Sequence, residues 1–280
     1  MSDYYELDFL DVESDKGGDA ITLRYRENNI EHIHVTDGGY QKDGEKIVNY
    51  IKKYYDNPSK IDNVILTHQD DDHAGGLREL FEAFSVGTLW MLRPWLYSEE
   101  LLPYFKRFTT IEGLTKRLKE VYSNISALED IAQEKGVIIK EPFQGNKIGA
   151  FTVLSPTKEK YLELIINSDK TPDSTQENII LDSFFSSMKE GINYIRAIWG
   201  LETFPDTGTS CENEMSVIQY ADLCNHKILL TGDAGREALD LAAEYAPYVG
   251  LKLPGIDKFQ VPHHGSRHNV SSEILDKWVV

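Results

Sequence analysis

Two histidines and three aspartates stand within six consecutive residues, in the stretch Thr67-His68-Gln69-Asp70-Asp71-Asp72-His73-Ala74-Gly75-Gly76. The apolar run 64–66 before it predicts a short buried strand, and the apolar spacing over 77–81 predicts a helix after it. Ligands of open α/β sheets gather at the carboxyl ends of strands. Carboxylates that cap a helix would explain one or two of the aspartates, but not the histidines on either side. The stretch therefore predicts a metal site.

Three other predicted strands end in residues that could take part. Strand 227–230 runs into Asp233, and strand 259–261 opens onto Pro262-His263-His264-Gly265-Ser266. Strand 32–35 ends at Asp37, which is either a turn residue or a group that hydrogen-bonds metal ligands from behind. We expect the carboxyl ends of these strands to bring the side chains together. The other histidines are predicted to be ordinary strand or surface residues, namely His32, His34, His226 and His268.

Strands and helices alternate over most of the chain, which predicts an α/β fold. Strands are expected at 5–12 and 20–25, which form a hairpin, and at 88–92, 137–139, 151–154 and 216–220. Helices are expected at 44–55, from 75, at 236–245 and at 271–277.

Two segments interrupt this alternation. Residues 96–135 are predicted to form a helical insertion. A second insertion is expected at about 158–210, with a helix-like piece at 161–166, a later helix rich in Phe and Ile, and a loop at 206–210. The last residues, 278–280, resemble the start of a strand, which suggests a truncated C-terminal end.

The formal net charge of −17 argues against a protein that coats duplex DNA, because such proteins usually present a basic face. It does not argue against phosphodiester chemistry, since metal ions supply local positive charge. The two cysteines, Cys211 and Cys224, are too few for a disulfide framework. Without a signal peptide or a membrane span of about 18 apolar residues, we expect a cytoplasmic protein.

Taken together, these segments resemble the metallo-β-lactamase superfamily. The loop is similar to its H-x-H-x-D-H motif, with Asp70 in place of the second histidine. That replacement resembles the soluble branch typified by the nuclease-like domain of the competence protein ComEC. The branch is further indicated by Phe9-Leu10-Asp11-Val12, Gly18-Asp19-Ala20, Asn213-Glu214-Met215-Ser216-Val217, Leu229-Leu230-Thr231-Gly232-Asp233 and Val261-Pro262-His263-His264-Gly265-Ser266. The resemblance implies one domain over 1–280, an αββα sandwich of two mixed sheets with helices on the outer faces and two insertions.

The resemblance also implies a ligand set for two divalent ions. His68 and Asp70 would hold the first ion, and Asp72, His73 and His264 the second, with Asp233 bridging both. No histidine stands near 210–216, so Asn213, or else Glu212 or Glu214, would complete the first site. Oxygen ligands favour Mn²⁺ or Mg²⁺ and imidazole suits Zn²⁺, so Zn²⁺ or Mn²⁺ is expected, with Mg²⁺ also possible.

Catalytic roles follow from that chemistry. A water activated by two metals would attack phosphorus, with Asp70, Asp72 or Asp233 orienting it or taking its proton. His263 would assist the leaving group or touch a phosphate oxygen, and Ser266 would touch substrate or serve the turn.

The leading expectation is a nuclease that cuts DNA or RNA. A phosphodiesterase on a small substrate, such as a cyclic nucleotide or a phosphocholine ester, is the alternative, and a non-catalytic metal-binding module is a third. Soluble relatives of this kind often accompany other proteins in bacterial defence, so the insertions are expected to offer surfaces to a protein partner.

Overall fold

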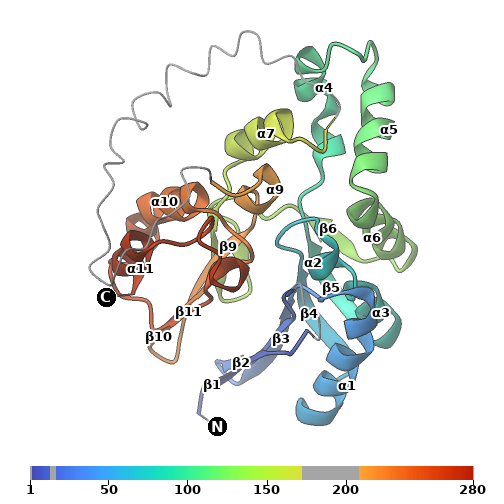
Figure 1. The fold of residues 1–280 in the computed structure, drawn as a ribbon. Helices are drawn as coiled ribbons and strands as arrows, with labels where there is room; N and C mark the ends of the chain where they lie inside the picture. The colour runs from blue at the N-terminus through green and yellow to red at the C-terminus, as the bar shows by residue number, and fades with distance from the viewer. Residues whose placement is uncertain (1, 13–16, 172–207, 280) are drawn as a thin grey trace.

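Two mixed β-sheets face each other in the computed structural model of the chain, which describes residues 2–12, 17–171 and 208–279 (Figure 1). The first sheet has the order β1-β2-β3-β4-β5-β6, with β3 to β6 parallel and β1 to β3 antiparallel. Its strands are β1 Tyr4–Phe9, β2 Ile21–Glu27, β3 Ile30–Thr36, β4 Lys60–Ile65, β5 Ser85–Trp90 and β6 Ile138–Lys140.

The second sheet has the order β11-β10-β9-β8-β7, antiparallel except for the parallel pair β10 and β11. Its strands are β7 Lys147–Ile148, β8 Phe151–Ser155, β9 Ile218–Leu223, β10 His226–Leu230 and β11 Lys258–Phe259. An apolar layer joins the two sheets, because alternate residues of β2 point toward β8, β9 and β10. It consists of Ile21, Leu23, Tyr25, Phe151, Ala221, Leu223, Ile228 and Leu230.

Helices cover the outer faces of both sheets (Figure 1). Helix α1 (Gly44–Tyr54) buries Ile47, Val48 and Ile51 over the first sheet beside α3 (Leu77–Ala83), as their spacing of three and four predicts. Helices α10 (Arg236–Tyr245) and α11 (Ser272–Trp278) cover the second. The predicted αββα sandwich of two mixed sheets is thus confirmed.

The predicted helical stretch 96–135 contains α4 (Ser98–Leu101), α5 (Ile111–Val121) and α6 (Ser123–Glu134). Of the second predicted insertion, α7 (Lys158–Asn167) is described, whereas the Phe- and Ile-rich helix and part of the predicted loop fall on 172–207, outside the described residues. Helix α9 (Cys211–Glu214) follows. The described residues also form short helices: α2 Asp71–Ala74, η1 Gln41–Asp43, η2 Pro94–Tyr97, η3 Leu102–Tyr104, η4 Ala246–Val249 and η5 Pro262–Gly265.

One prediction near the C-terminus is wrong. Residues 278–279 do not start a strand, since Trp278 closes α11 and Val279 N donates to Leu275 O at 2.8 Å. The Trp278 side chain is fully buried against Phe259, so its apolar character serves helix packing rather than a sheet. Strand β9 also begins at Ile218, two residues later than expected, and β7 was not expected.

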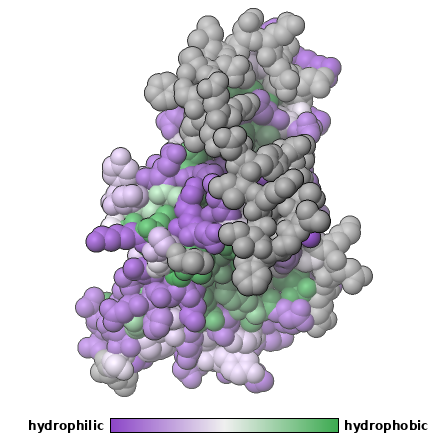
Figure 2. Space-filling model, turned by 60° about the vertical axis from the view of Figure 1, so that its left-hand side comes forward, coloured by the Kyte–Doolittle hydropathy of each residue, from purple (hydrophilic) through white to green (hydrophobic). Residues whose placement is uncertain are grey.

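The surface is mixed. On the face shown in Figure 2, the coloured residues are mostly hydrophilic, with smaller green hydrophobic areas between them. Among the residues that the structure describes, no helix has both the length and the apolar character needed to cross a bilayer.

Candidate metal centre

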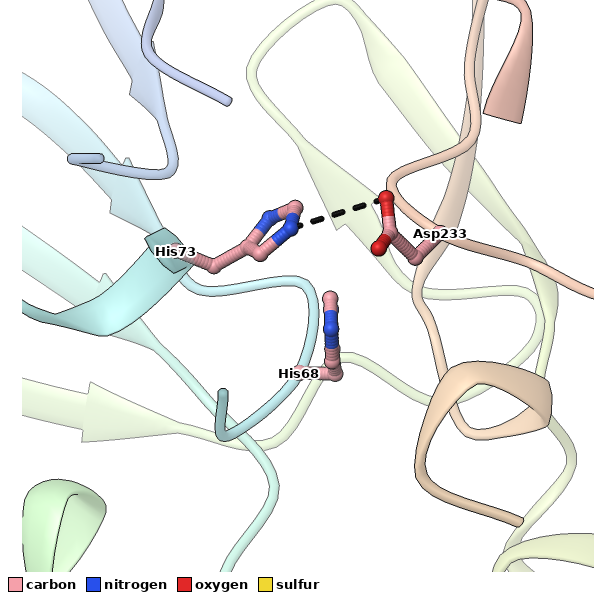
Figure 3. Close-up of side chains that lie close together, drawn as sticks. All are labelled: His68, His73 and Asp233. Atoms are coloured by element: carbon pink, nitrogen blue, oxygen red, sulfur yellow. Dashed lines mark ion pairs between the residues drawn. The ribbon is translucent and has the colours of Figure 1, made fainter. Parts of the chain in front are cut away.

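Three buried ligand atoms converge where the two sheets meet. Nε2 of His68, Nε2 of His73 and Oδ1 of Asp233 have no hydrogen-bond partner among the described residues. Ligand atoms of the three residues lie within 4.8 Å of one another, with His73 Nε2 3.5 Å from Asp233 Oδ1 (Figure 3). Buried polar atoms are normally hydrogen-bonded, so three orphans facing a common point indicate a cation site.

Asp37 holds His73 from behind. The His73 ring donates from Nδ1 to Asp37 Oδ2 at 2.8 Å, which leaves Nε2 to face the centre. The Asp37 carboxylate also accepts from Thr67 N at 2.8 Å and Thr67 Oγ1 at 2.6 Å. Burial disfavours the charged ring, but the carboxylates of Asp37 and Asp233 raise the pKa of His73 well above its usual range. An ion would therefore compete with a proton for this nitrogen.

His68 is the neutral partner of this pair. Its ring is fully buried, with centroid 4.1 Å from that of His73, and its Nδ1 lies 3.1 Å from Thr67 Oγ1 and 3.3 Å from Ser216 Oγ. Burial, followed by the neighbouring His73, lowers the pKa of His68 to about 4. The unprotonated ring is the form that ligates metals.

Asp233 reaches the centre from the turn after β10. Burial would raise its pKa, but His73, His68 and His263 hold the pKa of Asp233 well below its ordinary value. Gly232 before it has φ +52°, and a Cβ there would lie 2.7 Å from Thr67 Oγ1. A glycine is required here by both the backbone angle and the space.

Two further carboxylates of the loop flank the orphan atoms. Asp72 Oδ2 lies 4.0 Å from His73 Nε2, and burial raises the pKa of Asp72. Asp70 Oδ2 lies 3.9 Å from His68 Nε2, and its Oδ1 accepts from Lys170 Nζ at 2.6 Å. Burial opposes charge on Asp70, but His68 and Lys170 lower its pKa. Sequence analysis missed Lys170, because an isolated lysine after a helix carries no signal.

The two histidines of the C-terminal loop face different ways. His263 Nε2 lies 3.8 Å from Asp233 Oδ2, while its Nδ1 lies 3.1 Å from Asn269 Oδ1. His264 Nε2 instead accepts from Gly18 N at 2.8 Å. Both histidines have left-handed backbone angles, φ 46° and 54°, which turn their side chains apart. The structure therefore places His263 beside Asp233, while Nε2 of His264, the expected ligand, is bonded to Gly18.

The candidates for a further ligand near 212–214 are engaged elsewhere. Asn213 Nδ2 donates to Thr209 Oγ1 at 2.9 Å and lies 3.2 Å from His263 Nδ1. Glu212 accepts from Ser168, and Glu214 accepts from Ala238 N at 2.8 Å. The printed bonds of Asn213 use Nδ2, so its amide oxygen is the atom that would ligate an ion.

Ser266 serves the turn. Its amide donates to His263 O at 2.9 Å, and its Oγ accepts from His268 N at 3.3 Å. These bonds agree with the turn role expected for Ser266, and its expected contact with substrate stays a prediction.

Asp19 is a carboxylate that sequence analysis did not place in the site. Ligand atoms of Asp19, Asp37 and His73 also lie within 4.8 Å of one another. Gln260 Nε2 donates to Asp19 Oδ2 at 2.7 Å, and burial raises the pKa of Asp19 to about 7. The Gly17-Gly18-Asp19 turn was the available signal, because it lies within the predicted hairpin and sets Asp19 directly before the second strand.

The donor set fits a divalent metal ion. Two imidazole nitrogens and a carboxylate oxygen are ligands of Zn²⁺ in catalytic sites, and the added carboxylates also suit Mn²⁺. The orphan atoms of His68, His73 and Asp233 would hold the ion, and Asp72 and His263 lie at its edge.

Sequence comparison agrees with this geometry. The model of the metallo-beta-lactamase superfamily matches residues 25–141, which include β3 to β6 and the loop with His68 and His73. The chain is thus similar to that superfamily over these residues, which make up less than half of its length. No curated protein sequence matches the chain.

The chain is also similar, at low identity, to several solved structures. The hydrolase AbOPH of the beta lactamase superfamily is 12% identical, with a TM-score of 0.43, over 90% of this chain and 77% of that one. A metallo beta lactamase from Hirschia baltica is 14% identical, with a TM-score of 0.35, over 88% and 82%. AidC, a dizinc quorum-quenching lactonase, is 12% identical, with a TM-score of 0.36, over 82% and 67%.

Proposed function

We propose that this protein is a metal-dependent phosphodiesterase, and that it acts as a nuclease on DNA or RNA. The observation that supports a hydrolytic metal centre is that ligand atoms of His68, His73 and Asp233 lie close together. Each of these residues has a buried ligand atom without a hydrogen-bond partner. The choice of a phosphodiester rests on the sequence resemblance to the ComEC-like branch, including Asp70 in the loop and the His263-His264 pair.

A bound divalent ion lowers the pKa of water and stabilises negative charge on a phosphoryl group. Around it, Asp37 fixes the His73 ring through Nδ1, so that Nε2 stays on the ion's side. Asp72 is partly exposed, and its raised pKa suits a base that takes the proton of the attacking water. His263 is more exposed, with its ring oriented by Asn269, and it can protonate the leaving oxygen or add a ligand.

The test is hydrolysis of plasmid DNA, single-stranded DNA, RNA and bis(p-nitrophenyl) phosphate, with Zn²⁺ or Mn²⁺ added. We expect cleavage of a polymer, and its loss by roughly 100-fold or more in Asp233→Ala, because one oriented catalytic group is worth about that much. Asp222→Ala, on an exposed position of β9, is the control and keeps full activity. A wild-type protein that hydrolyses neutral esters but no diester would contradict the proposed substrate.

A small phosphodiester is the second candidate, favoured by a specific observation. Both predicted insertions reach the metal loop: Asn124 of α6 hydrogen-bonds Asp71, and Lys170 after α7 pairs with Asp70. These contacts narrow the approach to the centre. Hydrolysis of bis(p-nitrophenyl) phosphate and cyclic nucleotides without any cut polymer would establish this candidate instead.

A further inference from the structure

Lys170 lies against a carboxylate that the superfamily resemblance assigns to a metal ion. Its Nζ is 2.6 Å from Asp70 Oδ1, whereas Asp70 Oδ2 faces His68 Nε2 at 3.9 Å. The distance is that of a charge-assisted hydrogen bond between an ammonium and a carboxylate. The negative charge that would attract a first ion is therefore already balanced by a side chain of the same protein.

The backbone that carries Lys170 is firmly anchored. Lys170 N donates to Ser168 Oγ at 3.0 Å, and Ser168 Oγ in turn donates to Glu212 of α9. Thr171 Oγ1 donates to Ser168 O at 2.8 Å and to Ile165 O at 3.0 Å. Ser168 and Thr171 are buried, so the turn 168–171 has a fixed place and delivers the ammonium to Asp70. In an ordinary surface ion pair, the backbone next to the lysine is not held by buried hydrogen bonds in this way.

Three protein ligands suffice to hold one divalent ion. The three orphan atoms of His68, His73 and Asp233 face one common point. A separate first site would have to share His68 with that point and share Asp70 with Lys170. Of the residues expected to complete that first site, Asn213 hydrogen-bonds Thr209 through Nδ2 and lies beside His263, and Glu212 accepts from Ser168.

We propose that Lys170 takes the place of one of the two expected metal ions. The centre then binds one divalent ion tightly, at His68, His73 and Asp233, and binds a second only weakly. A second cation would have to approach the ammonium and displace it from Asp70, and like charges that close repel strongly in a partly buried site. This inference concerns the stoichiometry of the centre and holds for either proposed substrate.

Calorimetric titration with Zn²⁺, without substrate, tests the proposal on wild type, Lys170→Met and Lys170→Arg. Lys158→Met is the matched control, because Lys158 is also a part-exposed lysine of this segment, paired with Glu100 at 2.7 Å. We expect one tight equivalent in wild type and in the Lys158 variant. In Lys170→Met a second equivalent binds about tenfold tighter or more than in wild type, and Lys170→Arg, which keeps the charge, behaves like wild type.

Electron paramagnetic resonance with Mn²⁺ gives an independent readout. Spin coupling between two adjacent ions is expected at two equivalents in Lys170→Met and not in wild type. Wild-type protein that binds two Zn²⁺ ions with comparable affinity would overturn the proposal, whether or not any variant folds. Equal second-site affinity in folded wild type and Lys170→Met would overturn it too. Since no ester is present, failure of the phosphodiesterase assay does not affect either result.

Discussion

His263 and His264 are adjacent in sequence but have different surroundings, and this difference can be tested. His263 points to Asp233 and is held by Asn269, whereas His264 packs on the turn at Gly18. We expect His263→Ala to lower Zn²⁺ affinity or diester turnover by about tenfold or more. His264→Ala should leave metal affinity within about threefold and lower the unfolding temperature instead. If His264→Ala instead lowered the Zn²⁺ affinity and His263→Ala only the unfolding temperature, His264 would be the ligand, as the sequence predicts.

Asp37 is expected to matter for the ion without touching it. It is fully buried and accepts hydrogen bonds from His73 and from two donors of Thr67. Asp37→Asn keeps the size but can no longer accept from all three donors, so we expect Zn²⁺ affinity to fall by roughly 10- to 100-fold. Asp222→Asn, at an exposed carboxylate of β9, serves as the control. Unchanged Zn²⁺ affinity in Asp37→Asn, measured calorimetrically, would contradict the positioning role.

The turn after β10 depends on a single glycine. Gly232→Ala places a methyl group against Thr67 at φ +52°, so we expect a loss of about 1–3 kcal/mol in the free energy of unfolding. Gly250→Ala is a useful comparison, because Gly250 is also left-handed, at φ +78°, but has open space around its Cα. Urea unfolding should show the larger loss for Gly232→Ala, and equal losses would mean that the space beside Thr67 is irrelevant.

Between the sheets, β3 contributes a buried histidine to the contact with the second sheet. His34 stacks on Phe151 of β8, and its Nε2 lies 3.3 Å from Gln219 Oε1 of β9. Burial lowers the pKa of His34 to about 4, against about 6.5 in an unfolded chain. Between these values the unfolded state binds a proton that the folded state does not, so stability falls as pH drops from about 6.5 to about 4.

The effect of His34 on the free energy of unfolding is at most about 3 to 4 kcal/mol, at 1.36 kcal/mol for each unit of pKa difference. Urea unfolding at a series of pH values should therefore show a shallower pH dependence in His34→Gln than in wild type. His226→Gln, at an exposed end of β10, should not change the slope. If the free energy of unfolding changed with pH in the same way in wild type and His34→Gln, His34 would not be the source of the pH dependence.

Removing the ion should weaken the whole molecule, because the centre joins loops of both sheets. An ion that binds only the folded state adds about 4 kcal/mol at a thousandfold excess over its Kd. We expect chelation to lower the unfolding temperature by several degrees. The stabilisation by Zn²⁺ should shrink as pH falls, because protons compete for His73, whose pKa is raised by Asp37 and Asp233 despite its burial. Calorimetric melts with and without Zn²⁺ at two pH values measure both effects.

Much of the architecture could be predicted from local patterns. The apolar spacing of α1 and the alternation in the first hairpin predicted their packing. The period of the apolar residues decides which face of a helix or strand is buried. The density of His and Asp over 68–73 likewise identified the metal loop. In contrast, the orientation of the His263-His264 pair depends on Gly18, 246 residues away, which no local pattern reveals. Lys170 was missed for the same reason, since only the folded turn 168–171 brings it to Asp70.

The contact between Gly18 and His264 has a consequence for how the protein is made. Asp19 and the loop 259–266 lie near opposite ends of the chain, and the centre needs Asp233 as well as the loop at 68–73. Contacts between residues so far apart in sequence form late, because closing a long loop costs conformational entropy. A growing polypeptide that has left the ribosome only as far as β9 would already carry His68 and His73 without the groups that complete their site. We therefore expect a metal ion to bind only after these last residues are made, and a shortened product to lack it.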